Sequence, residues 1–188
     1  MDTKARIIQA AEQLFVEKGY ENVSVREIAK ASGCSHTAIY LYFKDKKELL
    51  NEIAQTPISV LHDQMKEIIL LNINGGDKLR ELIRMYVRFG LHHKDVYQLL
   101  ITVDSINVES NPTDDPLNEK RIQLFNLMKD VMSRYGSEDE LLSLTRLTFF
   151  QMHGIVMTYI NSKEEAEQIL KRIEQSLDMF ARSLEGLR

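Results

Sequence analysis

Residues 36–38 begin a short predicted helix with side chains suited to the edges of base pairs. The imidazole of His36 can hydrogen-bond to a guanine or a phosphate oxygen, and the methyl groups of Thr37 and Ala38 suit a thymine methyl. Side chains at the start of a helix reach base edges when that helix enters a major groove. These three residues therefore predict base contacts to double-stranded DNA.

Hydrogen-bond donors surround these three residues and suit phosphate oxygens. Arg26 can reach a base or a phosphate, and the alternative is a solvated side chain that pairs with a neighbouring acid. Backbone amides at the helix starts near Val25 and Lys46 add partial positive charge, which favours an anion. The predicted phosphate ligands are Ser24, Ser35, Tyr40, Tyr42 and Lys46.

Two short helices and a tight turn are predicted to position these groups. Ser24 and Glu27 have the spacing of a capping box, which begins the first helix. Gly33 can adopt a positive φ and so ends it, and Ser35 caps the second. The second helix is expected to run to Phe43. Ile39 and Phe43 are expected to point inward, and Ala29, Gly33 and Ile39 let the two helices cross closely. This pattern is typical of a helix-turn-helix unit.

The remaining sequence predicts an all-α protein of about nine helices, with a three-helix head over residues 1–47 and a helical body over 48–188. Pro57 is expected to kink or break the fourth helix near Thr56, either as a static kink or as a joint between body and head. The predicted segments are helices Thr3–Lys18 (capped by Asp2), Lys46 onward, Lys78–His93, Asp95–Ile106, Leu117–Tyr135, Ser137–Ile160 and Ser162–Leu187, with a loop at Asn107–Pro116. Capping boxes are expected at Ser137 with Glu140 and at Ser162 with Glu165.

Composition indicates a cytoplasmic protein. The formal net charge is −4, but the first fifty residues carry nearly equal numbers of bases and acids, and Lys44, Lys46 and Lys47 form a local basic cluster. Cys34 is the single cysteine, so an intrachain disulfide is excluded. The N-terminus lacks the apolar segment of a signal peptide, and no apolar run approaches the ~20 residues that span a bilayer.

The stretch GYENVSVREIAKASGCSHTAIYLYFKDKKELL resembles the DNA-binding head of the tetracycline-repressor (TetR) family. The resemblance covers about the first fifty residues and implies a dimeric one-component regulator, most often a repressor, released from its operator by a small molecule. The family often has Lys-Gly-Thr where this chain has His36, Thr37 and Ala38, Val at Cys34 and His at Leu41. Base contacts therefore cannot be copied from relatives, and the operator sequence is not implied.

The last two predicted helices suggest a dimer, because the helix from Ser137 is apolar on more than one face and must bury each of them. Two such helices from each of two chains would form a four-helix bundle, as in the resembled family, and the alternative is a helical hairpin within a monomer. Residues expected at this homodimer interface are Met152, Ile155, Tyr159, Ile173, Leu177 and Phe180.

The resemblance also implies a cavity among the middle helices for a small, hydrophobic effector with a few polar anchors. The simplest alternative is ordinary core packing. The expected pocket residues are Met65, Tyr86, Phe89, Phe125, Met128 and His153.

Other functions find less support in the sequence. His92, His93 and His153 could be imagined as a metal site of an enzyme, but no HExxH, paired Cys/His or nucleophile motif is present, so we expect no catalytic residue, metal or cofactor. A helical interaction module that has lost DNA binding is a further alternative, as is a redox-responsive regulator. The latter would need an exposed, activated Cys34, whereas an apolar plug is expected there.

Overall fold

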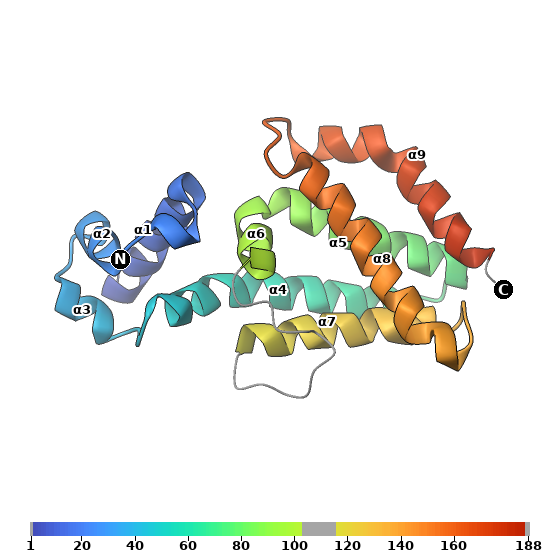
Figure 1. The fold of residues 1–188 in the computed structure, drawn as a ribbon, viewed down its shortest axis with the longest axis horizontal. Helices are drawn as coiled ribbons and strands as arrows, with labels where there is room; N and C mark the ends of the chain where they lie inside the picture. The colour runs from blue at the N-terminus through green and yellow to red at the C-terminus, as the bar shows by residue number, and fades with distance from the viewer. Residues whose placement is uncertain (1, 103–115, 187–188) are drawn as a thin grey trace.

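The computed structural model describes residues 2–102 and 116–186, and within these residues it is built from helices alone (Figure 1). A small head at one end carries the first three α-helices, and a longer body carries the last five. The fourth helix, α4, joins them. The all-α prediction is confirmed. The end of the helix expected to reach Ile106, and nearly all of the predicted loop 107–116, lie outside the described residues.

The head packs α1 (Thr3–Lys18), a 3-10 turn η1 (Tyr20–Asn22), α2 (Val25–Ser32) and α3 (His36–Tyr40) around a small apolar core. This core does not stop at α3, because Leu49, Leu50 and Ile53 of α4 belong to it. The division at residue 47 stays a prediction, while the buried cluster of the head extends to Ile53. Asp2 precedes α1 as expected but makes no side-chain capping bond.

The long helix α4 (Lys46–Leu70) continues through Pro57 without a break, so the break expected near Thr56 is wrong. A proline inside a helix removes one backbone hydrogen bond and crowds the preceding turn. Ala54 and Ile58 on either side of it are fully buried, so packing keeps the chain helical across the lost bond. The choice between a static kink and a joint stays open.

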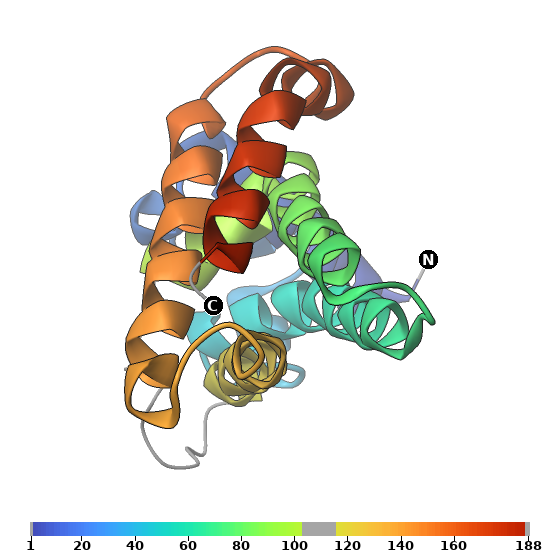
Figure 2. The ribbon, with the colours of Figure 1, turned by 90° about the vertical axis from the view of Figure 1, so that its right-hand side faces the viewer.

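The body consists of α5 (Gly75–His92), α6 (Lys94–Thr102), α7 (Pro116–Met132), α8 (Glu138–Tyr159) and α9 (Ala166–Glu185). Helix α5 is central, since it packs against α4, α6, α8 and α9, and Figure 2 shows it between α4 and α9. Helix α7 lies along α4 and contacts α8, which crosses it at a large angle (Figures 1 and 2). One continuous apolar core fills the body.

Capping explains the helix starts that differ from expectation. Helix α5 begins at Gly75 rather than Lys78 because the Asn74 side chain accepts the amide of Asp77 at 2.9 Å. The capping box expected at Ser162 is absent, since α9 begins only at Ala166. The box at Ser137 is confirmed, where the Glu140 carboxylate accepts the Ser137 amide at 3.2 Å.

Gly90 lets α5 approach α8 and α6 closely. A β-carbon at this position would lie 2.7 Å from both methyl groups of Val156 and 3.1 Å from a ring carbon of Tyr97. Contacts this short force neighbouring side chains or backbone to move.

We predict that Gly90→Ala lowers the free energy of unfolding by ~1–3 kcal/mol, because the added methyl overpacks this crossing. Denaturant unfolding of the variant, of Val156→Ala and of the double variant measures the effect. Val156→Ala opens space, so the double variant should lose less stability than the sum of the two single variants. Additive losses would contradict a direct clash between these positions.

Candidate nucleic-acid interface

Helix α2 begins at the predicted capping box. The Ser24 hydroxyl accepts the Glu27 amide at 3.3 Å, and the Glu27 carboxylate accepts the Ser24 amide at 2.9 Å. Lys18 of α1 donates to the same carboxylate at 2.9 Å. The bond from Lys18, followed by those from Ser24, lowers the pKa of Glu27 to about 2. The start of α2 is therefore fixed to α1 by an ionised carboxylate throughout the neutral range.

The turn between α2 and α3 has the predicted geometry. Gly33 lies in the left-handed region at φ 68°, and the amide of Cys34 reaches back to the Ala29 carbonyl at 3.0 Å. The Ser35 hydroxyl then accepts the Ala38 amide at 3.1 Å and caps α3. Cys34 is only half-buried, with its sulfur 2.7 Å from the Ser32 hydroxyl oxygen, so it is less enclosed than the expected apolar plug.

Close crossing of α2 and α3 rests on buried apolar residues. Ile28 and Ala29 of α2 meet Ile39 of α3 in the head core, and Phe43 joins them. Helix α3 is shorter than expected, because it ends at Tyr40. Beyond it the amides of Tyr42 and Phe43 both point to the Ile39 carbonyl at 3.0 Å, which turns the chain toward α4. Helix α3 is thus about one and a half turns long, and a tight turn follows it directly.

The side chains predicted to contact DNA gather on the outer surface of this unit. Seven of them are exposed, and Val25 and Ala38 are half-buried. The rings of His36 and Tyr40 meet edge to face at 5.1 Å between centroids, so the two side chains form one surface. The exposed residues are Ser24, Arg26, Ser35, His36, Thr37, Tyr40 and Tyr42. Leu41 lies beside them and is 79% exposed. The sequence did not predict this exposure, because the side chain of Leu41 is apolar.

Lys46 has a different environment from that of a free phosphate ligand. Its ammonium donates to the carbonyls of Tyr20 at 2.7 Å and Val23 at 3.0 Å, and lies 4.1 Å from the centre of the Tyr20 ring. The first residue of α4 therefore ties this helix to the segment that precedes α2. Lys44, two residues earlier, is exposed and belongs to the same basic cluster.

The residues predicted for a dimer interface divide by burial. Met152, Ile173 and Leu177 are at most 7% exposed and belong to the core of the protomer itself, which corrects their assignment to a partner contact. Ile155, Tyr159 and Phe180 are half-buried at the edge of that core. The outer faces of α8 and α9 instead expose Leu147, Phe150 and Met179, which are 58%, 66% and 59% accessible.

The residues predicted for an effector pocket all lie in or against the body core, and three of them are linked through two aromatic residues outside the predicted set, Tyr97 and Phe149. The Tyr97 hydroxyl lies 3.4 Å from that of Tyr86 and 3.1 Å from Nδ1 of His153. Phe149 stacks on Phe125 at 5.4 Å between ring centres and meets Tyr86 edge to face. Met65, Phe89 and Met128 are buried elsewhere in the same core.

Burial sets the protonation of this aromatic group. It raises the pKa of both tyrosine hydroxyls, Tyr86 and Tyr97, and lowers the pKa of His153. At neutral pH the cluster therefore holds neutral hydroxyls and a neutral imidazole, which can donate and accept hydrogen bonds without carrying charge.

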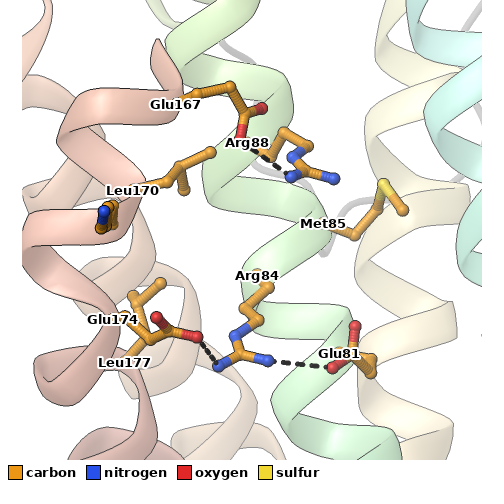
Figure 3. A pocket seen from close by; sticks show the side chains of 9 residues that line it. Glu81, Arg84, Met85, Arg88, Glu167, Leu170, Glu174 and Leu177 are labelled. Carbon is orange, nitrogen blue, oxygen red and sulfur yellow. Dashed lines mark hydrogen bonds and ion pairs between the residues drawn. The ribbon is translucent and has the colours of Figure 1, made fainter.

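A hollow lies between α5 and α9 and is lined mainly by charged side chains (Figure 3). Arg84 reaches Glu174 at 2.7 Å and Arg88 reaches Glu167 at 3.1 Å, so ion pairs cross this groove of about 310 Å³. None of the six residues predicted for an effector pocket lines it.

Metal ligands do not cluster in the part of the chain that the structure describes, where no group of three or more His, Cys, Asp or Glu side chains could hold an ion. His92 instead pairs with Glu167, at 3.0 Å from Nε2. Over the same residues, none of the helices combines the length and apolar character needed to cross a bilayer.

Two family models match this chain. Residues 7–53 match the model described as bacterial regulatory proteins, tetR family. Residues 79–184 match a model described as tetracyclin repressor-like, C-terminal domain, which is more than half of the 188 residues. The chain belongs to the TetR family. The resemblance seen in the first fifty residues is confirmed, and the body belongs to the family as well.

Relatives of this TetR-family protein are helix-turn-helix regulators. An uncharacterized transcriptional regulator of Haemophilus influenzae is 25% identical over 96% of this chain and 89% of its own length. The ketosteroid transcriptional regulator of Mycobacterium tuberculosis has a TM-score of 0.70 at 18% identity and covers 95% of this chain and 94% of its own. FadR of Bacillus subtilis, solved with stearoyl-CoA, has a TM-score of 0.67 at 20% identity. The match covers 94% of this chain and 96% of FadR. The family members and structural neighbours are transcriptional regulators rather than enzymes. At 18% and 20% identity, the two solved structures show only that this chain shares their fold.

We predict that Lys46→Met lowers the stability of the head by ~1–3 kcal/mol, because it removes two charge-assisted hydrogen bonds to backbone carbonyls. Hydrogen exchange of the α2 amides measures this loss. Lys44→Met is the matched control, since it removes a charge from the same cluster at an exposed position. Equal protection of α2 in the two variants would contradict the structural role of Lys46.

Proposed function

We propose that this TetR-family protein is a cytoplasmic, dimeric transcriptional repressor that binds a near-palindromic DNA operator and is released by a small molecule. The observation that carries the proposal is the exposed polar surface of α3, held by the cap at Ser35 and the left-handed turn at Gly33. A helix presented in this way can enter a major groove.

Contacts to DNA follow from the chemistry of the exposed side chains. His36, Thr37 and Ala38 face the base edges, and Arg26 reaches a base or a phosphate. Phosphates are bound by Ser24, Ser35, Tyr40 and Tyr42. Lys44 takes the role that the sequence predicts for Lys46, because the Lys46 ammonium is bonded to the carbonyls of Tyr20 and Val23. The start of α2 at Val25 adds the positive end of its helix dipole.

Dimerisation uses the outer faces of α8 and α9. Ser143, Leu147, Phe150 and Gly154 recur at helical spacing on the exposed side of α8, and nothing lies within 4 Å of a β-carbon built on Gly154. A surface with exposed large apolar side chains beside an open glycine suits close approach of a second helix. A two-fold dimer would place its two α3 helices about 34–36 Å apart, one turn of DNA.

The effector lies in the body, against the cluster of Tyr86, Phe125 and His153. Neutral hydroxyls and an imidazole beside stacked phenyl rings suit a mostly apolar molecule with few polar groups. One structural neighbour is a ketosteroid transcriptional regulator, and another was solved in complex with stearoyl-CoA. Because these differ at almost equal structural similarity, the fold does not select the effector. Release requires that the effector bind more tightly to the dimer geometry that does not fit the operator.

Selection of bound sequences from a random DNA duplex pool, followed by salt titration, tests the DNA-binding function. We expect a near-palindromic motif with half-sites about one helical turn apart and affinity that falls steeply with salt. Weak, salt-sensitive binding without an enriched motif, also after ligand is removed by unfolding and refolding, would refute the proposal.

Two variants separate base contacts from phosphate contacts. His36→Ala should relax the preference at one position of each half-site, at a cost of ~1–3 kcal/mol for the preferred base. Tyr42→Phe should weaken binding to all sequences by a similar factor, because a phosphate contact carries no base information. Parallel selection with both variants measures this difference. Unchanged preference in His36→Ala, or altered preference in Tyr42→Phe, would reverse our assignments.

The dimer face is tested by Phe150→Glu, which should raise the dimer dissociation constant at least ~30-fold because it places a charge in an apolar contact, a loss of ~2 kcal/mol or more. Sedimentation equilibrium measures it. Leu70→Glu is the matched control, since Leu70 is an 83% exposed apolar residue at the far end of α4. A dimer that tolerates the change at Phe150, or that is disrupted by the change at Leu70, would refute this interface.

A further inference from the structure

One buried side chain in the body has no hydrogen-bond partner among the described residues. Asn118, in the first turn of α7, is 0% exposed, and neither its amide nitrogen nor its amide oxygen is bonded. Leaving a buried polar group without a partner destabilises the folded protein, and an apolar residue of similar size would avoid this loss. Such a group in a folded protein calls for an explanation, and a ligand that completes its bonds is one.

A permanent positive charge lies one turn further along the same helix. Arg121 is 9% exposed, and residues three apart on a helix have β-carbons ~5–6 Å from one another. Its charge acts to lower the pKa of the Tyr86 hydroxyl, against the larger effect of burial, so the guanidinium lies near Tyr86 of α5 and on the interior side of α7. An arginine stays protonated even in such surroundings.

The polarity of α7 changes along its inner face. Asn118 and Arg121 come first, within two turns of the helix start at Pro116, where the helix dipole favours an anion. Phe125 and Met128 follow on the same face, and both are at most 5% exposed. Phe125 stacks on Phe149 of α8. The face therefore offers hydrogen-bond donors and a positive charge at one end and aromatic surface at the other.

We propose that the body binds an amphipathic anion, with its carboxylate or phosphate held by Arg121 and Asn118 and its apolar part against Phe125 and Phe149. This deepens the proposed function by naming the chemical class of the effector. A guanidinium and an amide N–H₂ are the donors that oxyanions accept. The aromatic surface further along α7 suits a hydrocarbon chain or ring, but cannot discriminate between them.

Binding of three matched probes to the full chain tests the charge preference: dodecanoate, its coenzyme A thioester and 1-dodecanol, each below its aggregation concentration, followed by isothermal titration. At least one anion should bind ten-fold or more tightly than the alcohol. Tight binding of dodecanoate identifies a carboxylate as the bound group, whereas tight binding of the thioester alone identifies its phosphates. Equal affinity of all three probes, or no binding of either anion, overturns the proposal.

Asn118→Leu separates a ligand contact from a structural role. The variant should weaken binding of the preferred anion ten-fold or more and leave the alcohol unchanged. It should also raise the melting temperature of the ligand-free protein, because a leucine has no bonds to complete. Lys129→Met, further along α7, is the matched control and should leave anion affinity intact. Unchanged anion affinity in Asn118→Leu overturns the assignment of this residue.

Failure of this inference differs from failure of the proposed function. A protein that binds its operator but shows no preference for anions over the alcohol retains its function as a repressor and loses only this ligand class. A protein that prefers the anions and loses affinity in Asn118→Leu, yet selects no DNA, keeps the binding site and loses the repressor function.

Discussion

Burial of one helix in two separate cores determines how this protein is organised. The first turns of α4 place Leu49, Leu50 and Ile53 in the apolar cluster of the head, and the next turns place Ala54 and Ile58 in that of the body. Neither cluster can be completed without α4. The helix-turn-helix head therefore has a fixed connection to the body, which a flexible linker would not provide.

Local signals made the head predictable from its sequence. Its capping box, its glycine turn and the inward spacing of Ile39 and Phe43 each involve residues within a few positions of one another, and all are present in the structure. What sequence could not predict depends on distant parts of the chain. Lys46 was expected to bind phosphate because it is basic and follows the recognition helix, but its bonds to Tyr20 and Val23 arise only when α4 folds back onto the head.

Helix positions in the body were predictable, whereas the directions of their faces were not. Helix α8 has apolar residues on most sides, so periodicity alone cannot tell which side meets α5 and which side meets solvent. Its contacts with α5 and α7 bury Met152 and leave Phe150 exposed, two residues apart. Asn118 and Arg121 are missed for the same reason, since a polar residue near a helix start is usually solvated and only the packed neighbours reveal that these two are enclosed.

The length of α4 has a geometric consequence. Its 25 residues extend about 37 Å at 1.5 Å per residue, and its first residue is bonded to the segment that precedes α2. A rotation of about 5° at the far end of a rod of this length displaces the near end by about 3 Å, close to the spacing of roughly 3.4 Å between successive base pairs. A rotation of this size would thus displace the head by a distance comparable to one base-pair step.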